Sequence, residues 1–127
     1  MASLLLVDDD VSLLGALSRF LSDSGFQVVP CSTFEDAKRE IASLRPDILI
    51  TDVRLGAFNG LQLALLARDV RADVRLVVFS GFDDPVLKEE ARRLGALYLV
   101  KPVSGHALVQ ALRSDGSGRS DKSMTVD

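Results

Sequence analysis

Five side chains with complementary chemistry stand directly after short apolar runs of this chain: Asp8, Asp9, Asp52, Ser80 and Lys101. Two carboxylates about 4 Å apart repel by about 4 kcal/mol at an effective dielectric constant near 20, so a cluster of acids favours a bound cation. The available ligands are hard oxygens and they are few, which favours Mg²⁺ completed by water and phosphate oxygens. A lysine and a hydroxyl beside the ion would clamp a phosphoryl group, and one aspartate would remain free as a nucleophile.

The elements that must position these residues are predicted from hydrophobic periodicity. Four apolar runs are continuous rather than alternating, which is typical of strands covered on both faces, and a weaker fifth completes the set: residues 4–7, 48–51, 76–79, 96–100 and 27–31. Segments with apolar residues at helical spacing follow each run. Strand and helix alternating five times require parallel pairing with right-handed crossovers. We predict a (βα)5 doubly wound α/β fold with a five-stranded parallel sheet, whose strand ends gather the polar side chains at one edge.

Local signals mark where the helices begin. Asp10 precedes an apolar-periodic segment and is expected to cap its N-terminus. Ser32 and Glu35 have the spacing of a capping box, and Pro85 suits a first helical turn.

Length and composition limit the kind of protein. With 127 residues, 47% of them hydrophobic, the chain is predicted to form one domain, and a net charge of −3 argues against binding nucleic acid through the overall field. A single cysteine, Cys31, and a single histidine, His106, exclude an internal disulfide and a Cys/His zinc site. No window approaches 18 uninterrupted apolar residues, so we expect a cytoplasmic protein that does not enter the membrane. Residues 1–113 are predicted to form the domain, and residues 114–127, rich in Gly and Ser, a disordered tail or a truncated linker.

Four sequence segments, LLLVDDD, ILITDVRL, VVFSG and YLVKP, occur in this order. Together they resemble the receiver domain of two-component response regulators, over about Ser3 to Arg113. The resemblance implies a flavodoxin-like receiver fold in which Asp52 accepts a phosphoryl group from the phosphohistidine of a sensor histidine kinase or a phosphotransfer protein. It implies that Asp8 and Asp9 form the acidic pocket, and that Mg²⁺ is held there with Asp52 and the backbone carbonyl of Arg54. Such a protein is a signalling phosphoacceptor that catalyses only its own phosphotransfer and self-dephosphorylation.

The same resemblance assigns roles around the acceptor. Ser80 is the switch hydroxyl, Lys101 pairs with the phosphoryl group, and Tyr98 is the switch aromatic, although a half-buried strand position would explain a tyrosine there equally well. Arg54 and Phe82 are expected to tune the lifetime of the phosphoryl group. Output is expected to run through the face formed by the helix near residues 86–94, the strand at 96–100 and the last helix, toward an output domain or partner. The domain would be a monomer or a phosphorylation-dependent dimer.

One segment departs from the family pattern. The loop after Asp52 reads RLGAFNG, and Gly56 stands where the family commonly has a proline, which leaves the stiffness of this loop open. Gly60 still closes the loop.

The alternative function is a haloacid-dehalogenase-type phosphohydrolase, with Asp8 as nucleophile and Asp10 as acid. That family needs a further acidic motif after its lysine, which is missing beyond Lys101, and Asp52 would have no role.

Overall fold

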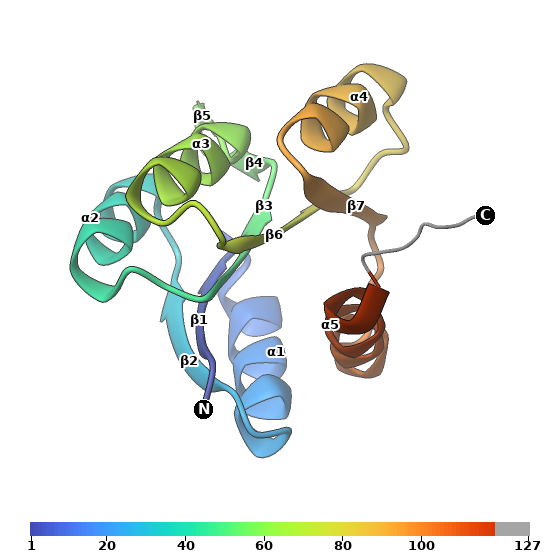
Figure 1. Cartoon of the computed structure of the whole chain (residues 1–127). Helices are drawn as coiled ribbons and strands as arrows, with labels where there is room; N and C mark the ends of the chain where they lie inside the picture. The colour runs from blue at the N-terminus through green and yellow to red at the C-terminus, as the bar shows by residue number, and fades with distance from the viewer. Residues whose placement is uncertain (119–127) are drawn as a thin grey trace.

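A parallel five-stranded sheet forms the centre of the molecule in the computed structural model, which describes residues 1–118, without the side chains of 115–118 (Figure 1). The strand order is β2-β1-β3-β6-β7, and every neighbouring pair is parallel. The strands are β1 (Ser3–Val7), β2 (Gln27–Cys31), β3 (Ile48–Asp52), β6 (Arg75–Ser80) and β7 (Ala96–Val100). The predicted doubly wound α/β fold is confirmed.

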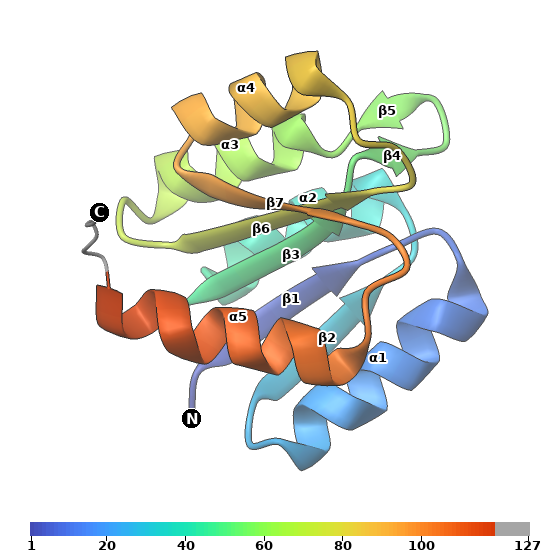
Figure 2. The ribbon, with the colours of Figure 1, turned by 90° about the vertical axis from the view of Figure 1, so that its right-hand side faces the viewer.

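Helices cover both faces of this sheet. On one face lie α1 (Val11–Asp23) and α5 (Gly105–Gly118), and on the other lie α2 (Phe34–Leu44), α3 (Leu61–Val70) and α4 (Pro85–Arg93) (Figure 2). Successive residues of β1 serve opposite faces, since Leu4 and Leu6 belong to the core cluster under α1 and α5, whereas Leu5 and Val7 belong to the one under α2 and α3. Burial on both sides is the reason that the strand sequences are continuously apolar.

The helix starts agree with the sequence at two positions and differ at one. Asp10 caps α1 by accepting a hydrogen bond from the Leu13 N–H at 3.1 Å, and Pro85 begins α4, as predicted. The expected capping box is wrong by one residue: Thr33, not Ser32, caps α2. Thr33 has the extended backbone that is typical of a capping residue. The helix starts directly after it at Phe34, whose ring is buried.

A two-stranded hairpin that periodicity did not predict follows β3. Its strands are β4 (Arg54–Leu55) and β5 (Phe58–Asn59), which pair antiparallel. The loop between them has two residues, and the first, Gly56, has a φ of 62°. A glycine at the first position of a two-residue loop is typical of hairpin turns that match the strand twist.

The last helix runs beyond residue 113. Because α5 extends to Gly118, the first residues of the segment predicted as a tail are helical, and residues 119–127 lie outside the described part of the chain. The predicted boundary between the domain and the tail, after residue 113, stays a prediction. Among residues 1–118, no helix combines the length and apolarity needed to cross a membrane.

Asp47 ties the start of β1 to the start of β3. The N–H of Ser3 donates a hydrogen bond to Asp47 Oδ2 at 2.7 Å, the Ser3 hydroxyl donates to the same oxygen at 3.2 Å, and Arg71 forms an ion pair with the carboxylate. The Ser3 backbone bond lowers the pKa of Asp47 most; burial opposes this effect, and Arg71 adds to it.

We expect Asp47→Ala to lower the free energy of unfolding by about 1–2 kcal/mol at pH 7, since it removes hydrogen bonds to a charged acceptor that is still a third exposed. A pKa below the unfolded value means that the stabilisation is present above the unfolded pKa and is lost as the pH falls through the folded one. Urea unfolding at pH 7 and at acid pH measures both effects. The control is Asp73→Ala, which also removes a partner of Arg71 but lies in solvent; equal losses in both variants would contradict the role of Asp47.

Candidate functional site

The predicted site residues meet at the carboxyl ends of the central strands. Asp8 and Asp9 follow β1, Asp52 ends β3, Ser80 ends β6, and Lys101 follows β7. From β1 the sheet continues to β2 on one side and to β3 on the other, so the direction in which strands are added reverses between β1 and β3. Ligands of open α/β sheets bind at such a switch point.

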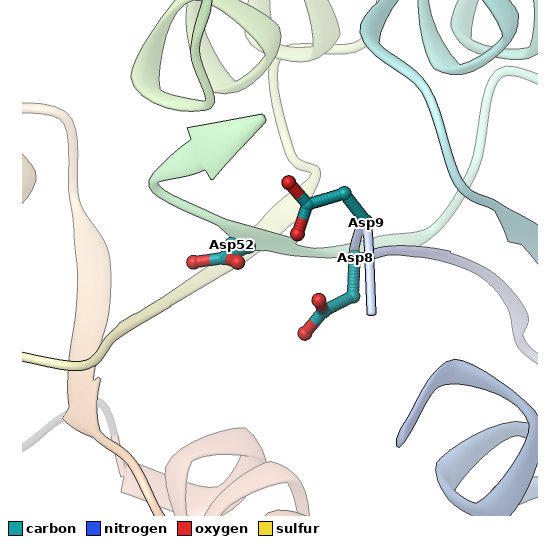
Figure 3. Close-up of side chains that lie close together, drawn as sticks. All are labelled: Asp8, Asp9 and Asp52. Carbon is teal, nitrogen blue, oxygen red and sulfur yellow. The ribbon is translucent and has the colours of Figure 1, made fainter. Parts of the chain in front are cut away.

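Three acids form the centre of the site. Asp8, Asp9 and Asp52 each place one carboxylate oxygen within 4.8 Å of the others (Figure 3). Asp8 and Asp52 are buried, whereas Asp9 is exposed and opens the cluster to solvent. A small set of hard oxygen donors with one open side fits Mg²⁺, which keeps several waters when it binds.

Lys101 lies against the two buried acids. Its Nζ donates hydrogen bonds to Asp8 Oδ2 at 3.0 Å and to Asp52 Oδ2 at 3.2 Å. The backbone places it there, because the Lys101 N–H donates to the Ser80 carbonyl at 2.7 Å. Burial by itself lowers the pKa of Lys101, but the bond to Asp8 and the charges of Asp52 and Asp8 more than offset this and raise it. The ammonium therefore stays charged beside the acids.

Burial raises the pKa of Asp52 above its usual range. The positive charge of Lys101 lowers this pKa, and the negative charge of Asp8 raises it further. The attraction to Lys101 therefore only partly offsets burial and the repulsion from Asp8. A more basic carboxylate is a stronger nucleophile, and an added cation would offset the remaining repulsion.

The loop after β6 connects Ser80 to Tyr98. Ser80 is buried, and its Oγ accepts a hydrogen bond from the Phe82 N–H at 3.2 Å. The hydroxyl of Tyr98, a half-buried residue of β7, donates to the Phe82 carbonyl at 2.7 Å. Ser80 and Tyr98 thus hold the same short segment from two strands.

Arg54 and Phe82 lie together next to Asp52 and Ser80. The Arg54 N–H donates to Asp52 Oδ1 at 3.4 Å, and the Arg54 guanidinium lies over the Phe82 ring, 5.4 Å from its centroid. A guanidinium at this distance from an aromatic face is attracted to it. The metal-ligand role of the Arg54 carbonyl stays a prediction.

Two glycines shape the acceptor loop. A Cβ on Gly60 would lie 1.9 Å from the Asp52 carbonyl oxygen, and the Gly60 N–H donates to the Val53 carbonyl at 2.6 Å, so only glycine fits where the loop closes. The N–H of Gly56 donates to Asp9 Oδ2 at 3.4 Å. Periodicity did not predict this contact, although the departure from the family's proline marked the position.

Three further polar residues that the sequence drew attention to are not part of the acidic cluster. Asp10, the acid that the phosphohydrolase alternative requires, caps α1. His106 is exposed, and Cys31 is buried, with its pKa raised to about 11 chiefly by burial.

The fold and the site together define a class of protein: a doubly wound α/β domain with an acidic, lysine-containing pocket at the switch point. The model of the response regulator receiver domain family matches residues 4–113. This chain therefore belongs to the receiver domains of two-component response regulators, which act in signal transduction. The phosphohydrolase alternative is not supported.

Individual relatives agree. The photosynthetic apparatus regulatory protein RegA of Rhodobacter capsulatus is 34% identical over 115 residues, which cover 90% of this chain and 62% of that protein. The acid tolerance regulatory protein ActR of Sinorhizobium medicae is 33% identical over 111 residues, covering 87% and 57%. The chain thus spans about three fifths of the length of these relatives.

Solved structures confirm the flavodoxin-like receiver fold. The chemotaxis response regulator CheY4 of Vibrio cholerae superposes with a TM-score of 0.81 at 26% identity, covering 90% of this chain and 98% of that one. A response regulator of Burkholderia pseudomallei, solved with a phosphorylated aspartic acid, calcium ion and citrate, gives a TM-score of 0.83 at 26% identity, covering 92% and 69%.

Proposed function

We propose that Asp52 accepts a phosphoryl group from the phosphohistidine of a sensor histidine kinase or phosphotransfer protein. The observation that carries this is the contact of Lys101 Nζ with Asp52 Oδ2, at a buried carboxylate that shares a cluster with Asp8 and Asp9. A carboxylate oxygen of Asp52 attacks phosphorus, the new O–P bond forms as the P–N bond breaks, and the imidazole leaves with the electron pair. The product is an acyl phosphate on Asp52.

Asp8, Asp9 and Asp52 would hold Mg²⁺, together with the Arg54 carbonyl. When bound, the ion supplies positive charge beside the phosphoryl oxygens. Lys101 supplies a second positive charge, and its Nζ already contacts Asp52 Oδ2. The related Burkholderia pseudomallei protein, with its phosphorylated aspartic acid and calcium ion, supports both proposals.

The signal would then pass through the loop after β6. Ser80 Oγ accepts a hydrogen bond from the Phe82 N–H, and its own O–H would donate to a phosphoryl oxygen on Asp52. A hydroxyl drawn toward the phosphoryl group would pull on the Phe82 segment that it holds. Because Tyr98 donates to the Phe82 carbonyl, a shift of this loop reaches β7 and the start of α4. Complete switching from 1:99 to 99:1 needs about 5.5 kcal/mol, to which such a network can contribute a large part. The output partner would bind the face formed by α4, β7 and α5, as an output domain or a separate protein.

The test is phosphorylation by acetyl phosphate with Mg²⁺, followed by mass-spectrometric mapping of the modified residue. We expect the label on Asp52. A label on Asp8 would overturn the proposal, because Asp8 is the nucleophile of the phosphohydrolase alternative.

The lifetime of the phosphoryl group should depend on Arg54 and Phe82. These side chains contact each other beside Asp52 and Ser80, and neither can act as a general base for water, so we expect a comparatively long-lived acyl phosphate. Phe82→Ala or Arg54→Asn should shorten the lifetime severalfold without preventing phosphorylation, since a loss of about 1.4 kcal/mol accelerates hydrolysis tenfold. Decay of the label after removal of acetyl phosphate gives the rate. Phe20→Ala, at a partly exposed phenylalanine of α1, is the control; wild-type decay in both site variants would show that the two side chains do not restrict water.

A further inference from the structure

The β4–β5 hairpin occupies the place where the family commonly has a proline-containing loop. Its turn depends on Gly56, whose φ of 62° is in the left-handed region and whose N–H is used as a donor. A proline has φ near −65° and no N–H, so it could provide neither feature. The glycine that departs from the family pattern therefore allows a hairpin turn to form beside the acids of the proposed metal site.

The Gly56 N–H of the hairpin turn donates its hydrogen bond to Asp9. This aspartate is the exposed member of the acidic cluster, so burial does not hold its carboxylate in place. Within the described residues 1–118, the Asp9 side chain accepts a hydrogen bond from the Gly56 N–H at Oδ2. This bond orients the carboxylate and leaves the second oxygen available to a cation.

The hairpin is itself anchored at two points. Leu55 of β4 is buried in the core cluster under α2 and α3. On β5, the ring of Phe58 stacks on Phe34 with centroids 4.6 Å apart and planes 14° from parallel, although Phe58 is 47% exposed. A cavity of about 310 Å³ separates the turn from the start of α2, and Asp9 is part of its lining. The aromatic stack is therefore one of the two contacts that hold the turn near Asp9.

We propose that Phe58, by stacking on Phe34, is a positioning residue for the metal site: it holds the Gly56 N–H against Asp9 and so strengthens the binding of Mg²⁺. The inference rests on the proposed function, because it takes Asp9 as a ligand of the ion. Outer partners that orient a metal ligand typically change affinity by about 10–100-fold. Phe58 acts through one further contact, so a smaller change, of about threefold to tenfold, is expected.

The test is a titration of the isotope-labelled chain with Mg²⁺, followed by backbone amide resonances. Phe58→Ala should weaken Mg²⁺ binding by about threefold to tenfold, and Phe58→Tyr, which keeps a ring for stacking, should bind like the wild type. Leu65→Ala is the matched control, because Leu65 is an exposed apolar residue of neighbouring α3, 55% exposed against 47% for Phe58, and is not part of the stack. Urea unfolding of each variant shows that the domain remains folded, which separates positioning from a general loss of structure.

The outcomes separate the two proposals. If the wild type binds Mg²⁺ and Phe58→Ala binds equally well, the role of the hairpin is overturned and the metal site stands. Equal weakening in Phe58→Ala and Leu65→Ala would also overturn it, because a nonspecific loosening of this face would then explain the result. A wild type that binds no Mg²⁺ would overturn the metal site and the hairpin's role together.

Discussion

Asp52→Asn is expected to abolish labelling by acetyl phosphate. The substitution keeps the size of the side chain but removes the carboxylate oxygen that we propose as the nucleophile, and a carboxamide is a far weaker nucleophile. Lys101 would keep its bond to Asp8, so the domain should remain folded. Incorporation of phosphate measured by mass spectrometry should fall to background.

The matched control for this variant is Asp10→Asn. Asparagine caps helices as well as aspartate does, so α1 should be unaffected, and labelling should equal that of the wild type. The same control examines the phosphohydrolase alternative, which needs Asp10 as its acid. Residual labelling of Asp52→Asn at another carboxylate would contradict the assignment of the acceptor.

Asp9→Ala is expected to remove both Mg²⁺ binding and phosphotransfer. The cluster offers few protein ligands, and Mg²⁺ would retain several waters there, so we expect wild-type affinity of the order of millimolar. Loss of one of the three carboxylates should move binding out of the measurable range. Without the cation, the negative charges of the acids and the phosphoryl group repel each other. Amide resonances during titration give the affinity, and acetyl phosphate labelling gives the transfer.

Removal of metal from the wild type should have the same consequence, so EDTA should prevent labelling. Asp36→Ala, at an exposed acid of α2 that pairs with Arg39, should leave affinity and labelling unchanged. Tight binding by the wild type, or labelling that persists in EDTA, would show that the acids do not act through a weakly held cation.

Much of the site was predictable because local patterns determine it. The strands are recognisable from continuous apolar runs, and the polar residues that end them must meet, since parallel strands place their carboxyl ends at one edge. Asp8, Asp52, Ser80 and Lys101 were identified in this way. The resemblance to receiver domains then added roles that spacing alone does not give, such as that of Tyr98.

The start of α2 and the hairpin were less accessible to this reasoning. Ser32 and Thr33 are both of residue types that favour helix N-caps, and the structure shows that Thr33 is the one that caps α2. The hairpin strands have two residues each, too short for a period to be detected.

The sequence by itself determined the α/β class, the number of main strands and their places along the chain, and the edge at which the acids and the lysine gather. These follow from the period of apolar residues along the chain, whereas the order of the strands within the sheet came from the structure. Only the tertiary structure decided how the gathered groups act on one another. Lys101 bonds to Asp8 across 93 positions of sequence, Gly60 packs against the Asp52 carbonyl, and Phe58 of the hairpin stacks on Phe34. Such contacts depend on strand register, side-chain conformation and burial, which arise when distant segments pack and leave no periodic signal in the chain.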